Sequence, residues 1–300
     1  MKAITRITFF SDEGEKFFGE GPWRLLRLVE EKGSLRSAAL SMDMAYTKAL
    51  KLLKNAEAAL GFPLTTRTTG GRSGGGSALT PEAQQWLKRY EAYRDACVQA
   101  NQQLFRQMFP RIGCVIMASG MGRRFGGNKL MADFAGEPMI CRALSATEGL
   151  FASRVVVTRH ENIASLCRER GLSVVLHDLP DRSDTIRLGL DALGDVDACL
   201  FCPGDQPLLS RSTVAALCEC FRNNREKIVR PVFSGTPGAP VLFPAWAFAE
   251  LSTLPRGKGG QYVISCHPEA VAEVPVSDPD ELTDADTPQA LEHLRAISGK

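Results

Sequence analysis

Residues 114–129 read CVIMASGMGRRFGGNK, and this stretch decides the fold of the larger part of the chain. An apolar run leads directly into a glycine-rich loop that ends in a lysine. Glycines leave the backbone bare, so its N–H groups can approach phosphate oxygens, while Arg123, Arg124 and Lys129 add positive charge. The pattern predicts a strand followed by a loop that binds a nucleotide.

Two common nucleotide loops do not fit the spacing. A dinucleotide-binding fingerprint needs a third glycine at position 125, where the chain has Phe125. A Walker-type loop needs Gly-Lys followed by Ser or Thr, whereas Asn128 precedes Lys129 and Leu130 follows it. A glycine-rich turn without a ligand remains the alternative, so the other motifs must decide.

A second motif is DACLFCPGDQPLL, which begins at Asp197. Its apolar run, Ala198 to Cys202, predicts a buried parallel strand that Pro203 and Gly204 end. Asp205 then follows the carboxyl end of that strand, where open parallel sheets bind ligands, and a carboxylate there suits Mg²⁺. The alternative is an aspartate that opens a turn.

Four further segments complete the set of motifs, one before Asp197 and three after it. Residues 180–193, PDRSDTIRLGLDAL, predict a helix capped by Ser183 or Asp184, whose amino terminus attracts anions. Residues 235–244, GTPGAPVLFP, precede RGKGGQYVI, and DADTPQALEHL begins at Asp284. Thr287 and Pro288 are typical of a helix start, which is the alternative to metal binding in this last segment.

The order of these motifs resembles that of the MobA-like nucleotidyltransferases of molybdenum cofactor synthesis. The resemblance implies a Rossmann-like α/β domain with a mostly parallel sheet at residues 110–300. It also implies transfer of a nucleoside monophosphate from an NTP with Mg²⁺ to molybdopterin, CMP being favoured over GMP by Gln206. Ser119, where the family has Ala or Gly, and Ala239, where it usually has His, depart from the family pattern.

Carried over residue by residue, the resemblance implies three sets of site residues. The expected catalytic residues are Lys129, Arg124 and Asp205. The expected nucleotide-binding residues are Ala118, Ser119, Gly120, Met121, Gly122, Arg123, Arg124, Lys129, Ser183, Arg187 and Gly204. The expected metal ligands are Asp205 and Asp286, with Asp284 as the other candidate.

The cysteines, histidines and apolar runs of the sequence exclude a few other classes of function. The nine cysteines form no regular framework, which indicates reduced thiols. Cys199 and Cys202 are expected to point to opposite faces of a predicted strand, which argues against a zinc site. The four histidines show no ligand spacing. No apolar run approaches the roughly 20 residues of a membrane span, so we expect a cytoplasmic protein.

The first third of the chain is its basic part. Residues 1–110 carry 16 Lys and Arg against 11 acids, a charge of +5, which leaves −3 for the remainder of a chain of net charge +2. Residues 21–61 predict three short helices, in which Gly33 ends the first and Ser34 caps the second. Residues 62–79 add two β-prone runs around a glycine-rich loop, which is typical of a wing. A winged helix-turn-helix results, with a solvated basic face and a flexible linker as the alternatives.

This segment resembles the DNA-binding domain of the molybdate-responsive transcriptional regulators from Gly21 to about Tyr93. We therefore expect a winged helix-turn-helix domain at residues 1–80, a long dimerisation or linker helix at 81–109, and a homodimer on double-stranded DNA. The expected DNA contacts are Tyr46, Thr47, Lys48, Lys51, Arg67 and Arg72.

Two interpretations of the whole chain stay open. One is a nucleotidyltransferase that regulates itself through its DNA-binding domain and whose partners include molybdoenzymes. The other is a transcriptional regulator whose transferase-like domain only senses nucleotide or cofactor. Transfer to a sugar phosphate or another small acceptor would share the same fold and metal site.

Overall fold

The computed structural model describes residues 3–68, 76–122 and 124–298, so Arg72 and Arg123, two expected site residues, lie outside the described part. The chain forms two compact units, Met1–Phe105 and Arg106–Lys300. No helix in the described part is both long and apolar enough to cross a lipid bilayer.

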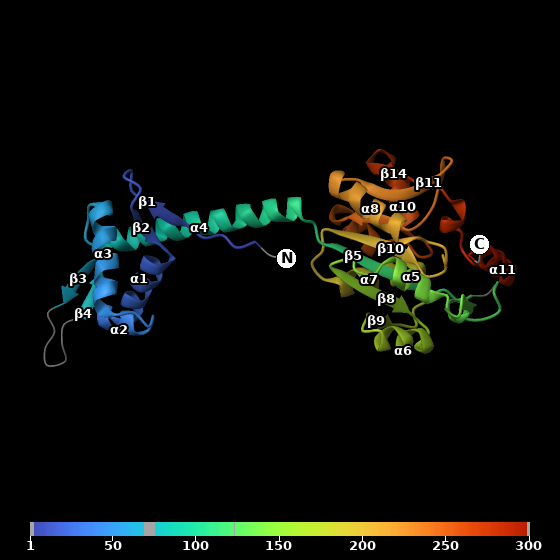
Figure 1. The fold of residues 1–300 in the computed structure, drawn as a ribbon, viewed down its shortest axis with the longest axis horizontal. Coiled ribbons are helices and arrows are strands. Elements are labelled where there is room, and N and C mark those ends of the chain that lie inside the picture. Colours follow the sequence, from blue (N-terminus) through green and yellow to red (C-terminus); the bar gives the residue numbers. More distant parts are fainter. Residues whose placement is uncertain (1–2, 69–75, 123, 299–300) are drawn as a thin grey trace. The chain divides into compact units, whose positions relative to one another are not determined.

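The first unit is a winged helix-turn-helix preceded by a β-hairpin (Figure 1). Its elements are β1 (Thr8–Phe10), β2 (Lys16–Gly19), α1 (Glu20–Lys32), α2 (Leu35–Leu40), α3 (Tyr46–Leu60), β3 (Thr65–Thr68), β4 (Gly76–Leu79) and the start of α4 (Pro81–Met108). The strands β3 and β4 pair antiparallel, as expected for a wing.

Local sequence signals set the turn between the first two helices. Gly33 ends α1 with a left-handed backbone (φ +64°), a conformation that glycine adopts without strain. The Ser34 hydroxyl then accepts a hydrogen bond from the Ser37 amide and caps α2. Both features confirm the sequence prediction.

The first part of α4 completes the core of this unit. Its Tyr90 is only 2% exposed, and its ring meets that of Phe18 from the amino-terminal hairpin at 5.0 Å. The next residue, Glu91, accepts hydrogen bonds from Trp23 and Arg27 of α1. This stretch of α4 is therefore bound into the first unit.

The second unit alternates strands and helices. Its strands are β5 (Ile112–Ala118), β6 (Asp133–Phe134), β7 (Glu137–Pro138), β8 (Ser153–Thr158), β9 (Ser173–Leu176), β10 (Ala198–Pro203), β11 (Ile228–Phe233), β12 (Thr236–Pro237), β13 (Val241–Pro244) and β14 (Val271–Pro275). Its helices are α5 (Ile140–Ala146), α6 (Glu161–Glu169), α7 (Arg182–Leu193), α8 (Arg211–Asn223), α9 (Phe248–Ser252), α10 (Gly260–Cys266) and α11 (Pro288–Ser298), with 3₁₀ turns η1 (Lys129–Met131), η2 (Ala245–Ala247), η3 (Pro268–Ala270) and η4 (Pro279–Leu282).

Within the described residues, eight of these strands build one sheet in the order β12-β11-β13-β10-β5-β8-β9, with β14 paired to β11, and β6 and β7 pair separately with each other. The strands β10, β5, β8 and β9 run parallel, and β13 runs antiparallel between β10 and β11. The expected Rossmann-like α/β fold with a mostly parallel sheet is confirmed. The carboxyl ends of four adjacent strands consequently meet at one edge.

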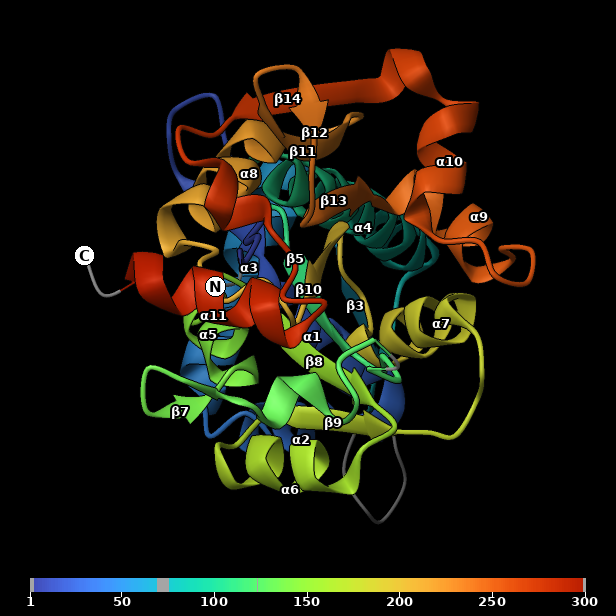
Figure 2. The ribbon, with the colours of Figure 1, turned by 90° about the vertical axis from the view of Figure 1, so that its right-hand side faces the viewer.

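Helices cover both faces of the sheet. The helices α5, α6, α8 and α11 lie on one face of the sheet and α7, α9 and α10 on the other (Figure 2). Their buried apolar side chains belong to two separate cores. Neighbouring residues of β10 divide between the two cores: Cys202 lies in the first and Cys199 in the second. Both thiols are free and buried, which confirms that they are core residues of opposite faces.

The helix α7 lies unusually close to the central strand. A Cβ built on Gly189 would come within 2.6 and 2.7 Å of the two γ-carbons of Val115 on β5. Glycine at this point lets the helix axis approach the sheet, and it thereby sets the position of the amino end of α7 over the site described below.

We predict that Gly189→Ala destabilises the second unit by about 1–3 kcal/mol, because the added methyl overpacks the interface between α7 and β5. Helix propensity alone predicts the opposite sign, a gain of about 1 kcal/mol. Differential scanning calorimetry of the full chain measures the effect. Asp191→Ala on the exposed side of the same helix is the control and leaves the transition in place. A gain in stability from Gly189→Ala would show that the close approach of α7 to β5 does not exclude a side chain at this position.

Candidate active site

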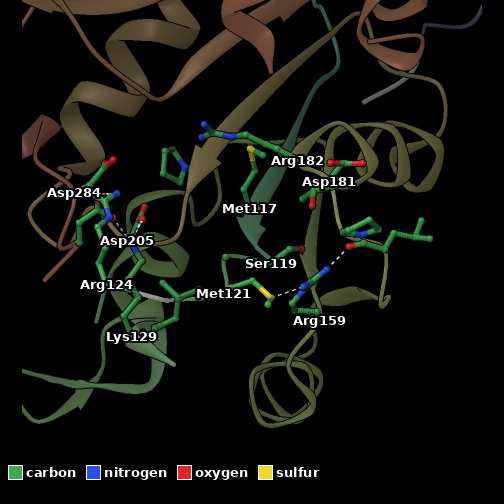
Figure 3. A pocket seen from close by; sticks show the side chains of 17 residues that line it. Met117, Ser119, Met121, Arg124, Lys129, Arg159, Asp181, Arg182, Asp205 and Asp284 are labelled. Carbon is green, nitrogen blue, oxygen red and sulfur yellow. Dashed lines mark hydrogen bonds and ion pairs between the residues drawn. The ribbon is translucent and has the colours of Figure 1, made fainter. Parts of the chain in front are cut away.

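The loops that follow the parallel strands enclose a cavity of about 380 Å³ (Figure 3). The residues that line it come from the ends of β5, β8, β9 and β10, from the start of α7 and from the segment before α11. Its position is the one that the parallel topology predicts, outside the carboxyl ends of the strands.

The glycine-rich loop after β5 folds back on itself. The amides of Phe125 and Gly126 donate to the Gly122 carbonyl at 2.9 and 3.0 Å. Gly122 has φ +59°, and a Cβ built on it would lie 2.0 Å from the Gly127 carbonyl oxygen, so no other residue fits there. This tight turn places Lys129 in the wall of the cavity.

A compact charge cluster occupies one end of the cavity. The Lys129 ammonium lies 2.5 Å from Asp205 Oδ2 and 2.7 Å from Asp286 Oδ1. Arg124 binds the other oxygen of Asp286 at 2.5 Å. The Asp205 carbonyl also accepts a hydrogen bond from the Ala285 amide at 2.8 Å, which ties the end of β10 to the segment before α11.

The pKa values in this cluster follow from its contacts. Burial by itself lowers the pKa of Lys129, but Asp205 and Asp286 outweigh burial and the net pKa is raised. The hydrogen bond from Lys129 lowers the pKa of Asp286. Although much of Asp284 is exposed, its carboxyl group accepts from Gln206 at 3.0 Å, and desolvation followed by the charge of Asp205 raises its pKa.

The two carboxylates that share the ammonium fit a divalent cation. Asp205 and Asp286 direct one oxygen each at the same point, and carboxylate oxygens are the donors that Mg²⁺ takes in proteins. Across residues 3–68, 76–122 and 124–298, no three His, Cys, Asp or Glu side chains gather closely enough to hold a metal by themselves. A cation here would therefore complete its shell with water or with ligand oxygens.

Most of the expected residues of the loop line the cavity, and others lie behind it. The lining includes Ser119, Gly120, Met121, Arg124, Lys129, Asp205, Asp284 and Asp286. Ala118 is buried, and its carbonyl accepts from Thr158. Gly204 packs against Ile140, where a Cβ would come within 2.8 Å.

The amino end of α7 differs from the prediction. Asp181, and not Ser183 or Asp184, caps the helix, and Asp184 closes a capping box by accepting from the Asp181 amide. The helix starts earlier because Asp181 and Asp184 have the spacing of a capping box. Arg187, an expected nucleotide contact, pairs with Asp184 at 3.2 Å. Neither Ser183 nor Arg187 is among the residues found to line the cavity, and their role stays a prediction.

Two arginines that sequence reasoning missed do line the cavity. Arg159 follows β8 and donates to the backbone carbonyls of Asp178 and Leu179 after β9. Arg182 is the first residue of α7. The sequence motif contains Arg182, but which of its side chains faces the cavity depends on where the helix begins.

A second cavity of about 330 Å³ adjoins the first. Met117, Arg182 and Pro203 line both. The second cavity is otherwise lined by residues that include Arg230, Gly238, Ala239, Phe243, Gly259 and Gly260. It thus brings together the two segments GTPGAPVLFP and RGKGGQYVI, which the sequence placed in the site without assigning their residues.

Comparison with known proteins identifies the second unit. Residues 114–271, more than half of the chain, match the family described as the MobA-like NTP transferase domain. The chain belongs to this family. The match covers β5 from Cys114 onward, the charge cluster up to Asp205, and both segments of the second cavity. The MobA-like domain therefore contains the site described above except for the segment with Asp284 and Asp286.

The relatives of the MobA-like domain agree with this assignment. A 3-deoxy-manno-octulosonate cytidylyltransferase of Alkalilimnicola ehrlichii is 38% identical over 103 residues, 32% of this chain and 38% of that protein. The solved structure of Rv0371c from Mycobacterium tuberculosis H37Rv has 20% identity and a TM-score of 0.56, covering 62% of this chain and 98% of its own. This second likeness shows the fold.

The first unit matches helix-turn-helix regulators. Residues 22–84 match the family described as the bacterial regulatory helix-turn-helix protein of the lysR family. Over 68 residues the chain is 37% identical to the transcriptional regulator ModE of Haemophilus influenzae, which is 23% of this chain and 27% of that protein. The chain thus spans between about a quarter and two fifths of the length of these two curated relatives.

The expected DNA-contact residues lie on the surface of this unit. Tyr46, Thr47, Lys48 and Lys51 are exposed at the start of α3, and Arg67 is exposed on β3. The buried side of α3 consists of Ala49, Leu53 and Ala56. The basic face of the helix is therefore free of the core.

We predict that Lys129→Met destabilises the MobA-like domain by about 1–3 kcal/mol in metal-free buffer, because Asp205 loses its ammonium partner and faces Asp286, which keeps only its contact with Arg124. The effect is smaller than for a fully buried ion pair, since the two carboxylate side chains are 20% and 34% exposed. Chemical denaturation with EDTA present measures it, with Lys258→Met, an exposed lysine, as the control.

The pH dependence of this effect has a definite sign. Lys129 lowers the folded-state pKa of Asp286 below its ordinary value of 3.8, so the stabilisation is present above that value and is lost as the pH falls through the lowered pKa. The difference between the wild type and Lys129→Met therefore shrinks in acid. A difference that stayed constant down to about pH 3 would contradict the ionic origin of the effect.

Proposed function

We propose that the protein transfers CMP from CTP with Mg²⁺ to the terminal phosphate of molybdopterin and releases pyrophosphate. The observation that carries this proposal is the pair of adjoining cavities, one ending in the Lys129 cluster and the other lined by Arg182 and Arg230. Two phosphate-bearing substrates can lie side by side there, with Arg182 next to both.

The chain's own residues supply positioning and charge. Lys129 and Arg124 carry the positive charge of the phosphate loop, and the bare backbone of Gly120 offers its amide to phosphate oxygens. Arg182 faces both cavities, so it can hold the attacking phosphate close to the α-phosphorus and neutralise charge as the two phosphates approach. No covalent intermediate with the protein is needed, because the acceptor phosphate is itself the nucleophile.

Asp205 and Asp286 would hold the metal. When bound, Mg²⁺ supplies charge neutralisation on the triphosphate and on the departing pyrophosphate. Asp284, whose carboxyl group hydrogen bonds to Gln206, lies beside this pair as a further candidate. A solved manganese complex of Rv0371c, which has the same fold, supports a divalent ion in this class of domain.

Different observations support the choice of cytidine as the base and of molybdopterin as the acceptor. The Alkalilimnicola relative is named a cytidylyltransferase, which favours CTP. The acceptor is inferred from the family and from the ModE-like first unit, which joins two molybdenum-related sequences in one chain. The second cavity, with Arg182 and Arg230 in its wall, suits a phosphorylated acceptor.

We further propose that residues 1–80 bind double-stranded DNA, that residues 81–109 pair two chains, and that residues 110–300 are the transferase. Tyr46, Thr47, Lys48, Lys51, Arg67 and Arg72 would contact the DNA. Tyr93 and Leu104 of α4 are 52% and 59% exposed, which supports a helix that associates with a second copy.

We predict that Asp205→Asn lowers pyrophosphate release by at least about 10²-fold, because a metal ligand and a partner of Lys129 are lost together. The assay contains CTP, Mg²⁺ and molybdopterin, with circular dichroism to verify the fold. Asp191→Asn on the exposed face of α7 is the control. Tight CTP binding without pyrophosphate release by the wild type would favour the alternative function, a regulator that only senses nucleotide.

We predict that Lys48→Ala weakens binding to non-specific duplex DNA and reduces the slope of log K against log salt by about 0.9, the effect of losing one phosphate contact. Fluorescence anisotropy over a series of salt concentrations measures the slope. Lys88→Ala, an exposed lysine on α4, serves as the control and leaves the slope unchanged. Equal slopes for the wild type and Lys48→Ala would exclude α3 from the phosphate contacts.

A further inference from the structure

A histidine after β8 holds one peptide of the glycine-rich loop. His160 Nε2 lies 3.0 Å from the Gly120 carbonyl oxygen. A carbonyl oxygen only accepts, so Nε2 carries a proton and donates it. His160 directly precedes α6, but its side chain makes no capping hydrogen bond with that helix. The hydrogen bond of the ring therefore goes to the loop and not to the helix.

The backbone of His160 is fixed by the sheet. Its amide donates to Thr158 Oγ1 at 3.1 Å, and the Thr158 hydroxyl in turn donates to the Ala118 carbonyl at 2.9 Å. Thr158 is fully buried at the end of β8. The imidazole consequently extends from a well-fixed strand end toward the loop that follows the neighbouring strand β5.

Neighbours of His160 make two further contacts with the same loop. Arg159 Nη1 lies 2.6 Å from Met121 Sδ, a contact that is drawn in Figure 3. At the other end of the loop, the Asn128 side-chain amide donates to Asn162 Oδ1 of α6 at 3.1 Å. The loop is thus attached near both of its ends to the segment that links β8 to α6.

The bond to His160 sets the direction of the next amide. The peptide that joins Gly120 and Met121 is trans, so its C=O and N–H point to opposite sides. Gly120 and Met121 line the cavity, whereas His160 is not among the residues found to line it. With the carbonyl turned to His160, the Met121 N–H is turned toward the cavity.

This amide is a donor that a ligand can use. In the described part of the chain the Met121 N–H has no hydrogen-bond partner. Gly120 by itself would let the peptide turn over, because a Cβ there would meet nothing within 4 Å and glycine adopts both signs of φ. The turned peptide would present its carbonyl oxygen, which repels phosphate, so the bond to His160 selects the orientation that attracts an anion.

We propose that His160 is a positioning residue for the triphosphate: its Nε2–H holds the Gly120 carbonyl so that the Met121 amide donates to a phosphate oxygen. This inference rests on the proposed function, in that the glycine-rich loop must bind the phosphates. Lys129 and Arg124 supply charge to that loop, whereas His160 supplies the direction of a backbone donor from outside the cavity.

The test uses inorganic tripolyphosphate, which has the phosphates of a nucleotide without its sugar and base. Nuclear magnetic resonance of the full chain labelled with ¹⁵N-methionine follows the Met121 amide, whose signal is identified by its loss in Met121→Leu. Tripolyphosphate with Mg²⁺ is expected to move this amide proton to higher chemical shift, because the proton enters a charge-assisted hydrogen bond. Isothermal titration calorimetry measures the affinity of the same samples.

Two substitutions separate positioning by His160 from simple packing. His160→Gln keeps an N–H donor near the place of Nε2 and is expected to retain both the Met121 shift and the affinity. His160→Leu keeps bulk without a donor, so the shift is expected to disappear and tripolyphosphate to bind about tenfold more weakly, the effect of losing one hydrogen bond to a charged group. His293→Leu on the exposed side of α11 is the control and changes neither.

The outcomes distinguish this inference from the proposed function. Binding of tripolyphosphate without a Met121 shift, or equal shifts and affinities in the Gln and Leu variants, would overturn the role of His160 and leave nucleotidyl transfer intact. Failure of tripolyphosphate to bind the wild type would also overturn it, and if CTP with Mg²⁺ failed to bind as well, the proposed function would fall with it. A Met121 shift that His160→Gln keeps and His160→Leu loses supports the inference.

Discussion

The contact of the Lys129 ammonium with Asp205 and Asp286 is the interaction on which the rest of the site depends. It joins residues that are 76 and 157 positions apart in the sequence. Opposite charges at hydrogen-bond distance in a partly buried place keep one another ionised. The phosphate loop, the end of β10 and the segment before α11 are therefore held around one cavity, and a nucleotide with its metal would exchange these contacts for its own.

The parallel strands and α7 make this arrangement possible. Parallel pairing of β10, β5 and β8 brings their carboxyl ends together, so that loops from distant segments can share a cavity. Gly189 then lets α7 approach β5, which places the first residue of the helix, Arg182, beside both cavities. Positioning of the two proposed substrates thus depends on backbone packing as much as on charged side chains.

Features with a local physical cause were predictable from the sequence. The end of α1 at Gly33, the cap at Ser34, the two strands of the wing and the buried strand before Asp205 all follow from neighbouring residues. The sequence predicts a start of α7 that is two to three residues too late, because Ser183 and Asp184 are also good capping residues, whereas Asp181 and Asp184 form the reciprocal cap. Because of this difference, the sequence does not assign Arg182 to the site and instead predicts Arg187 as a nucleotide contact, although the charge of Arg187 is paired with Asp184.

The sequence by itself determined the alternation of strands and helices, the winged helix-turn-helix and the glycine-rich loop, because each is encoded within a few adjacent residues. Only the tertiary structure decided which side chains share a cavity. The partners of Lys129, the second cavity at Arg182, and the hydrogen bond from His160 to Gly120 all join segments from different strands. Such contacts depend on strand order and on sub-ångström packing, which local propensity does not specify.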